Sequence, residues 1–241
     1  MAQAAVTDTT GSLARPEGLR GIIADFSSDQ RAFKNVPWGK AMMWIFLLSD
    51  TFIFSCFLIS YMTVRMSTTE PWPNAGEVFA LTLWGKKIPL ILIAIMTFVL
   101  ISSSGTMAMA VNFGYRKDRV KTFVLLLITA ALGATFVGMQ AFEWTELIMD
   151  EGICPWGNPL GAAQFGSSFF MITGFHGTHV SIGVIFLIIV AIKVLRGDFD
   201  HGRPGFFTGR KGKYEVVEIM GLYWHFVDLV WVFIFAVFYL W

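Results

Sequence analysis

Residues 223–231 read Tyr-Trp-His-Phe-Val-Asp-Leu-Val-Trp and place a histidine and a carboxylate inside a hydrophobic run of membrane-spanning length. An ionisable side chain at the centre of a bilayer costs about 3 kcal/mol or more. Such groups therefore persist where they are paired, buried against protein or used in a reaction. The function of this chain must be inferred from a few polar residues in an otherwise apolar sequence.

The composition of the whole chain is that of a membrane protein. Of its 241 residues, 55% are hydrophobic and 15% are charged, whereas soluble domains carry about 25% charged residues. The 24 Phe and 9 Trp residues suit lipid contact and the aromatic belts at membrane surfaces. The net charge of +1 indicates no nucleic acid or other polyanionic partner.

Five apolar stretches have nearly the length of roughly 20 residues that a helix needs to cross a bilayer. They cover residues 41–64, 88–111, 122–142, 167–195 and 218–240. A helix satisfies its backbone hydrogen bonds within one segment, as a membrane span must. We therefore predict an all-α fold, an integral membrane bundle of five transmembrane helices that forms one domain over residues 41–241. Residues 1–40 are polar, and we predict that they form a cytoplasmic N-terminal arm.

The basic residues divide unequally between the two ends of these spans. Fifteen of the 18 Lys and Arg residues fall on the side of the N-terminus, and three, Arg65, Lys86 and Lys87, fall on the other side. Basic loops stay on the cytoplasmic side of a membrane. The charge pattern therefore predicts a cytoplasmic N-terminus and a C-terminus that faces the periplasm.

Five ionisable residues lie well inside the spans. Asp50 lies in the first span, His176 and His179 in the fourth, and His225 and Asp228 in the fifth. With a helix rise of about 1.5 Å per residue, Asp50 and His225 share one depth, and the other three share a second. We predict carboxylate–imidazole pairs within each level, because pairing lowers the cost of burial. Asp50 is then either a proton-exchanging carboxylate or a hydrogen-bonded packing residue.

The three histidines also permit metal binding. His179 and His225 could ligate a haem from two helices, and His176 and His179 could bind copper together with Asp228. The alternative is a set of buried histidines that connect helices, which is the more common outcome for such residues. Spacing alone permits each of these interpretations and requires none.

Three further residues are predicted to lie at the membrane surface. Glu143 and Glu146 close the third span on the outer side, where we expect them to be solvated. Alternatively, these two carboxylates bind a proton or a lipid headgroup. Trp224 is expected to make a lipid or interfacial contact, as tryptophans in membrane proteins often do.

Four motifs in these spans carry a family resemblance. Residues 174–183 follow the pattern Gly-Phe-His-Gly-x-His-Val-x-x-Gly, and residues 140–144 read Gln-Ala-Phe-Glu-Trp. Residues 223–231 form the third motif, and Ser49-Asp50 on a Phe-rich helix forms the fourth. In this order they resemble the haem–copper oxidase (cytochrome c oxidase) subunit III family. The chain is similar to its short five-helix bacterial members.

The resemblance implies a non-catalytic subunit III of a respiratory terminal oxidase, which reduces oxygen to water and translocates protons. It implies that this chain binds phospholipid but no haem or copper, which belong to partner subunits. The implied partners are catalytic subunit I, subunit II and lipids in the bacterial inner membrane, in a complex that can join a supercomplex. The implied role is structural support, lipid retention and assistance to proton uptake.

The chain differs from the family pattern in two respects. Asp50 occupies the position of a buried glutamate, so its shorter side chain reaches less far than the family residue. Many members have seven spans, and this chain matches the last five of them. Two alternatives stay open, an accessory subunit of a nitric oxide reductase, and a haem- or copper-binding membrane protein that uses His176, His179 and His225.

Overall fold

The computed structural model of the chain describes residues 38–83, 86–157, 159, 161–199 and 214–240. Within these residues, five helices are long and apolar enough to cross a membrane, which confirms the predicted spans. They are α2 (Trp38–Ser67), α4 (Ile91–Tyr115), α5 (Arg119–Met149), α6 (Ala163–Arg196) and α7 (Glu215–Phe235), which continues through the π-helical turn η1 (Ala236–Leu240). The first three residues of α2 fall within the range assigned to the N-terminal arm, and the rest of that arm lies outside the described residues.

A short hairpin between α2 and α4 was not expected from the sequence. It follows the single turn α3 (Ala75–Val78) and consists of β1 (Ala80–Leu83) and β2 (Lys86–Pro89), paired antiparallel from Ala80↔Pro89 to Leu83↔Lys86. The predicted span began at Ile88, but Pro89 disfavours helical backbone in the residue before it. Leu90 then adopts a left-handed conformation with φ 59°, and the helix begins at Ile91.

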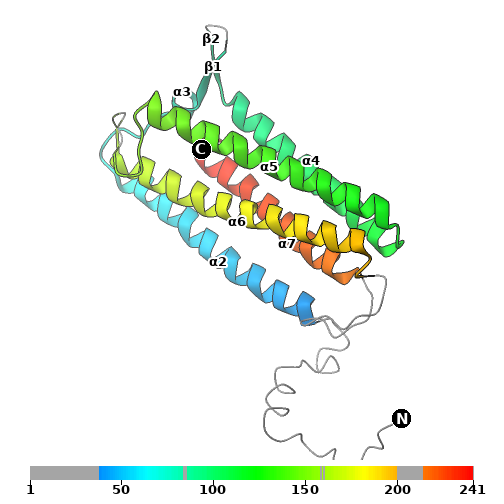
Figure 1. The fold of residues 1–241 in the computed structure, drawn as a ribbon. Coiled ribbons are helices and arrows are strands. Elements are labelled where there is room, and N and C mark those ends of the chain that lie inside the picture. Colours follow the sequence, from blue (N-terminus) through cyan, green and yellow to red (C-terminus); the bar gives the residue numbers. More distant parts are fainter. Residues whose placement is uncertain (1–37, 84–85, 158, 160, 200–213, 241) are drawn as a thin grey trace, which may run out of the picture.

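The helices alternate in direction, so their connections gather at two ends (Figure 1). The start of α2, the turn between α4 and α5, the end of α6 and the start of α7 lie at one end. The hairpin and the C-terminal end of η1 lie at the other. Helix α7 contacts α2, α4 and α6, and therefore occupies the middle of the bundle.

Four helices, α4 to α7, form a closely packed core around Trp224. A Cβ atom on Gly133 of α5 would lie 2.4 Å from Trp224 Cη2, and one on Gly183 of α6 would lie 2.9 Å from Trp224 Cζ3. The indole fills the space that these two glycines leave, and its Nε1 donates a hydrogen bond to Ser103 Oγ of α4 at 2.9 Å. One side chain of α7 therefore joins three neighbouring helices.

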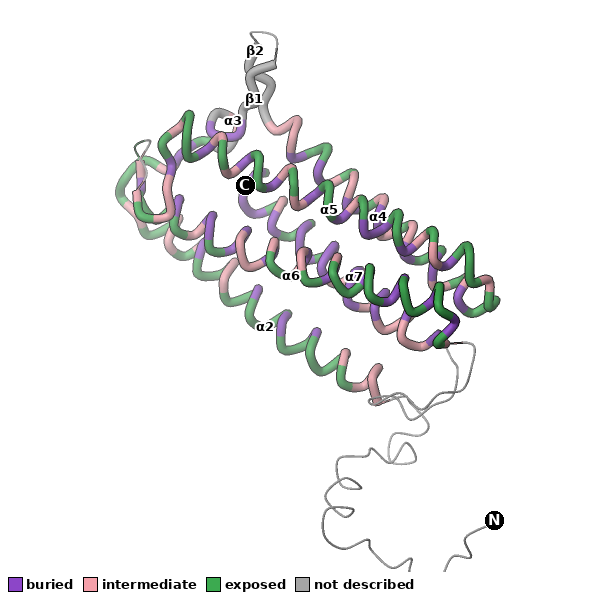
Figure 2. The backbone as a smooth tube through the Cα atoms, in the orientation of Figure 1, coloured by how far each residue is buried: buried purple, intermediate pink, exposed green. Residues whose placement is uncertain are grey.

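Helix α2 is attached along a single stripe. Its buried residues are Leu47, Asp50, Phe54 and Tyr61. These positions are three, four and seven residues apart, so they lie on one face of a helix. Most of the remaining α2 surface is exposed (Figure 2). Asp50 therefore belongs to the face that α2 turns towards the bundle.

Candidate functional site

Asp50 and His179 form the ion pair at the centre of the contact between α2 and α6. His179 Nε2 lies 3.5 Å from Asp50 Oδ1, and the two side chains are largely enclosed. The rings of Phe54 and Phe175 flank the imidazole, with centroids 5.8 and 4.7 Å from that of His179. Tyr223 of α7 donates a hydrogen bond to the backbone carbonyl of His179 at 2.9 Å. Three helices therefore fix the position of this pair.

The hydrogen bonds of His179 determine how the pair holds protons. His179 Nδ1 lies 2.8 Å from the carbonyl oxygen of Phe175. A carbonyl can only accept, so Nδ1 carries a proton and donates it. In a neutral imidazole, Nε2 would then present a lone pair to Asp50, and a lone pair repels a carboxylate. The pair is stable when one additional proton resides on Nε2 or on Asp50. This geometry therefore suits one proton shared by the two side chains.

The structure differs from the pairing that depth along the helices predicted. Asp50 was expected to pair with His225, and Asp228 with His176 or His179. His225 does lie close to the Asp50 level, because it lines a hollow with Leu47 and Thr51 of α2. The carboxylate of Asp50, however, points to α6 and not to His225. Helix rise gives the depth of a residue but not the direction of its side chain around the helix axis.

His176 is enclosed by aromatic rings instead of a carboxylate. It is 1% exposed, and its ring stacks on Trp231 of α7 at 5.4 Å between centroids. Phe54 and Phe136 pack edge-on against it. Neither ring nitrogen has a hydrogen-bond partner among the described residues. His176 thus lies one turn from His179 but outside the ion pair.

His225 belongs to a second cluster, between α4 and α7. Its Nδ1 lies 2.6 Å from Ser104 Oγ, and Ser104 also hydrogen-bonds Asp228. Asp228 is buried, with one carboxyl oxygen unpaired within the described part of the chain. His225 is only half-buried. The hydroxyl of Ser104 therefore connects the imidazole to the carboxyl group.

Glu143 was expected to be interfacial, and the structure differs from this expectation. It is 4% exposed and accepts hydrogen bonds from Gln140 Nε2 at 2.7 Å and from the Tyr239 hydroxyl at 3.1 Å. Gln140 lies three residues earlier on the same helix face, so the sequence contained a signal for this contact. Tyr239 belongs to η1, and no local sequence pattern predicts its contact with Glu143. Glu146, one turn further out, is partly exposed.

Trp224 also differs from its expected lipid or interfacial contact. It is buried in the centre of the core described above, where Gly133 and Gly183 admit its ring. Glycines at these two positions are the sequence feature that would have indicated a buried indole. Gly183 entered the sequence analysis only as the last residue of the motif 174–183.

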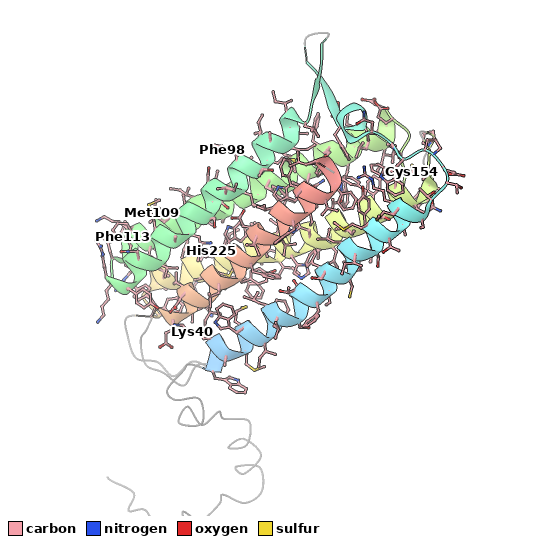
Figure 3. The ribbon with its side chains drawn as sticks, turned by 180° about the vertical axis from the view of Figure 1, so that it is seen from behind. Lys40, Phe98, Met109, Phe113, Cys154 and His225 are labelled. Carbon is pink, nitrogen blue, oxygen red and sulfur yellow. The ribbon has the colours of Figure 1, made fainter. Side chains whose placement is uncertain are left out.

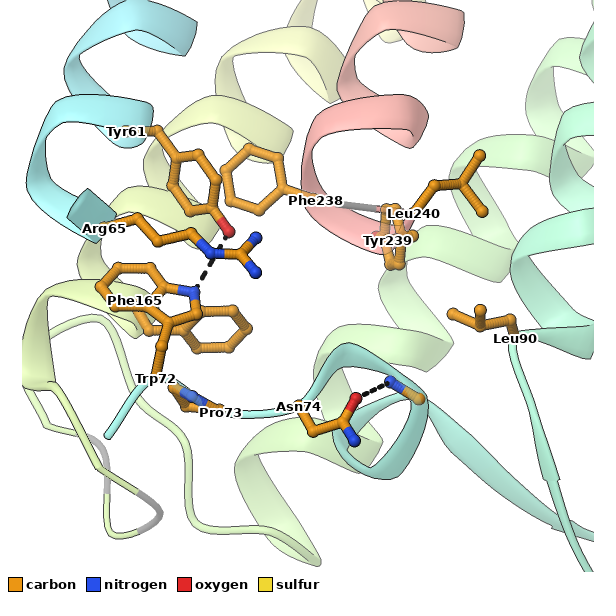
Figure 4. A pocket seen from close by; sticks show the side chains of 11 residues that line it. Tyr61, Arg65, Trp72, Pro73, Asn74, Leu90, Phe165, Phe238, Tyr239 and Leu240 are labelled. Carbon is orange, nitrogen blue, oxygen red and sulfur yellow. Dashed lines mark hydrogen bonds between the residues drawn. The ribbon is translucent and has the colours of Figure 1, made fainter. Parts of the chain in front are cut away.

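A cavity of about 560 Å³ lies at the hairpin end of the bundle (Figure 4). The labelled side chains of Tyr61 and Arg65 from α2 lie beside Trp72 on one side of it, and Trp72 Nε1 donates to the Tyr61 hydroxyl at 3.3 Å. Tyr239 also lines this cavity. Because the same tyrosine donates to Glu143, the buried carboxyl group is one residue away from a polar-walled opening.

Metal binding requires several donor side chains that converge on one point. Within the described ranges, no three His, Cys, Asp or Glu side chains gather in this way. The geometry instead distributes the ionisable groups over three clusters: Asp50 with His179, His225 with Asp228, and Glu143 with its two donors. Each cluster contains hydrogen-bonding partners from this chain.

Comparison with known proteins gives matches over most of the chain. The family described as "Cytochrome c oxidase subunit III" matches residues 25–241. A "Probable quinol oxidase subunit 3" of Staphylococcus saprophyticus is 32% identical over 214 residues, which cover 88% of this chain and 92% of that protein. A "Cytochrome c oxidase subunit 3" of Alkalihalophilus pseudofirmus is 31% identical over 198 residues, with coverages of 82% and 84%.

Proposed function

Because this chain belongs to the cytochrome c oxidase subunit III family, we propose that it supports, without a catalytic centre of its own, a haem–copper terminal oxidase that couples oxygen reduction to proton translocation. One observation carries the proposal: the family match spans all five membrane helices. Several polar groups inside the bundle also bond to one another, as Asp50 does with His179 and Glu143 with Gln140. Nothing in these matches favours a nitric oxide reductase subunit or an independent haem or copper protein.

The orientation in the membrane follows from where the basic residues lie. The start of α2, the α4–α5 turn and the end of α6 share one end of the bundle. The Lys and Arg residues near these points belong to the fifteen counted on the N-terminal side. We infer that this end is cytoplasmic. The bacterial relatives support a location in the bacterial inner membrane.

An apolar groove beside α2 supports a role in lipid retention. Its volume is about 550 Å³. The lining residues are Met43 and Phe46 of α2, His179, Ile182, Phe186 and Val190 of α6, and Val216, Ile219, Met220 and Tyr223 of α7. Such a wall suits an acyl chain, because it offers apolar contact almost throughout. We propose that a phospholipid chain occupies the groove and shields the Asp50–His179 pair from the membrane side.

The proton held between Asp50 and His179 supports a role in local proton supply. A site that gains and loses one proton inside a bundle can buffer protons for a neighbouring subunit. We expect Asp50→Asn to slow proton uptake or shorten the turnover lifetime of the oxidase, without changing its haem content. Asp50→Glu, which restores the family residue, should retain activity. Turnover and proton uptake unchanged in Asp50→Asn would leave Asp50 as a packing residue.

The decisive experiment for the proposed function is purification from membranes in a mild detergent. Mass spectrometry should identify a larger haem-bearing catalytic subunit I and a subunit II alongside this chain. Oxygen consumption by the preparation, with cytochrome c or a quinol as donor, identifies the complex as an oxygen reductase. Recovery with a nitric-oxide-reducing subunit, or as an isolated pigmented chain, would contradict the proposal.

A further inference from the structure

We propose that the face around His225, formed by α2, α7 and α4, is the docking surface for a transmembrane helix of another oxidase subunit. That helix presents a hydroxyl or carboxyl side chain to His225 Nε2. The inference rests on the proposed membership of an oxidase complex and specifies the face that the complex uses. Seen from behind, α7 runs between α4 and α2, and His225 lies on it (Figure 3).

The main observation is the environment of the second ring nitrogen of His225, Nε2. His225 lies ten residues after Glu215, which places it about 15 Å into the helix and therefore within the hydrocarbon. Nδ1 is used by Ser104, whereas no described residue forms a hydrogen bond with Nε2. The side chain is half-buried. A polar atom that faces hydrocarbon without a partner costs several kcal/mol.

A hollow of about 330 Å³ beside His225 gives the surface its shape. Its other lining residues are Trp44, Leu47, Leu48 and Thr51 of α2, and Leu222, Phe226 and Leu229 of α7. The lining side chains are therefore apolar apart from the imidazole, the indole N–H of Trp44 and one hydroxyl, and Thr51 already bonds its own backbone at Leu47. Apolar side chains together with one polar group, on a partner helix, would fit this hollow. Membrane helices provide such complements, since their contacts combine close packing with single interhelical hydrogen bonds.

The hydrogen bonds behind His225 specify the chemistry of the partner. When Ser104 donates its hydroxyl proton to Asp228, the Nδ1–H of His225 donates to Ser104 Oγ. Nε2 is then an acceptor in the neutral ring and a donor in the protonated ring. A hydroxyl or a carboxyl group can serve in both cases, whereas a lipid tail can serve in neither. This is why we assign the face to protein and not to lipid.

A small residue on α4 permits close approach to the same face. Ala108 lies one turn after Ser104 and therefore on the same side of α4. It is exposed, so its small side chain faces outwards and not a neighbouring helix. Small residues at such positions let helix backbones approach each other in a membrane.

Site-specific photocrosslinking in native membranes tests the docking surface directly. A photoreactive amino acid replaces Leu48 or Leu229 on the His225 face, or Phe142 on α5 as the matched control. The three side chains are 62%, 55% and 53% exposed, so their accessibility in the isolated chain is similar. We expect crosslinks from Leu48 and Leu229 to an oxidase subunit identified by mass spectrometry, and to lipid from Phe142.

The outcomes separate this inference from the proposed function. If oxidase subunits co-purify with the chain but Leu48 and Leu229 label lipid alone, the docking surface is wrong and the proposed function stands. A protein crosslink from Phe142 alone would move the interface to α5. If no oxidase subunit co-purifies, the proposed function itself is wrong.

A pair of bulky substitutions gives a second, independent measurement. Ala108→Phe places a ring on the proposed face, and Ala134→Phe places one on an exposed position of α5. Overpacking of an interface lowers affinity by roughly fivefold to a hundredfold. Retention of the catalytic subunit during purification should fall by about this factor for Ala108→Phe and stay near the parent level for Ala134→Phe. The reverse pattern would overturn the proposal.

Discussion

The core formed by α4 to α7 and the outlying helix α2 differ in how much of their surface is buried within this chain. In the apolar centre of α7, 56% of residues are buried, compared with 17% in that of α2. The core closes on itself through Trp224, which fits against glycines on two helices. Helix α2 is held along one stripe, by ring contacts of Phe54 and Tyr61 together with the Asp50–His179 pair, and spaces remain beside it. The difference indicates that the core packs closely within this chain, whereas hollows remain beside α2, which we propose for lipid and for another subunit.

The largest expected effect comes from blocking the space that Trp224 fills. Gly133→Val brings a side chain onto Trp224 and onto Val184 Cγ2, which lies 2.9 Å from a Cβ at this position. We expect a loss of roughly 1–3 kcal/mol or more in stability and little folded chain in the membrane. Gly138→Val on the same helix is the control, because nothing lies within 4 Å of its Cβ. Equal amounts of the two variants in membranes would show that the core is not closed around Trp224.

A smaller effect is expected when the polar attachment of α2 is removed. Asp50→Leu takes the carboxylate away from His179 and should destabilise the contact between α2 and α6 by about 1–2 kcal/mol. Thermal denaturation of the purified complex measures the change. Thr51→Val is the control, because the Thr51 hydroxyl bonds only to the Leu47 carbonyl of its own helix at 2.7 Å. A melting temperature that falls equally in both variants would assign the effect to α2 as a whole and not to the ion pair.

The His225 face beside α2 predicts a variant that folds normally but binds the catalytic subunit less tightly. His225→Leu removes the proposed hydrogen bond to the partner, which is worth about 0.6–1.7 kcal/mol in membrane proteins, or roughly three- to fifteenfold in affinity. Retention of the catalytic subunit should fall, while the chain stays in the membrane at its normal level. Ser104→Ala removes the bond to Nδ1 and leaves Nε2 in place, so it should retain more of the partner. Full retention in His225→Leu would show that Nε2 has no role in docking.

The smallest effect is expected at the N-terminal end of α2. Lys40 Nζ lies 2.5 Å from Glu218 Oε2 of α7, and Tyr115 of α4 donates to the same oxygen. Lys40→Ala should cost less than about 1 kcal/mol, because such partly exposed pairs contribute little. The difference in melting temperature from the parent should shrink at high salt, which screens the pair. A difference that is independent of salt would mean that Lys40 contributes through packing of its alkyl chain.

Single residues show how far the sequence could predict the site. Asp50, His176 and Asp228 were expected inside the bundle, and all three are buried. Their partners were harder to predict. Asp50 meets His179, which lies 129 positions later in the chain, and the side chain of Glu143 meets Tyr239 of η1. Such contacts depend on how each helix is rotated about its axis. Local apolar patterns define that rotation poorly when nearly every position is apolar.

The amino-acid sequence by itself determined the number of spans, their approximate limits and the excess of basic residues at one end. These properties depend on the length and polarity of single segments, which the bilayer selects one segment at a time. The tertiary structure alone decided that His179 and not His225 faces Asp50, that Trp224 lies between two glycines, and that Ser104 bonds one nitrogen of His225. These facts arise when helices rotate and tilt to fit one another, because close packing depends on the shapes of all neighbours at once.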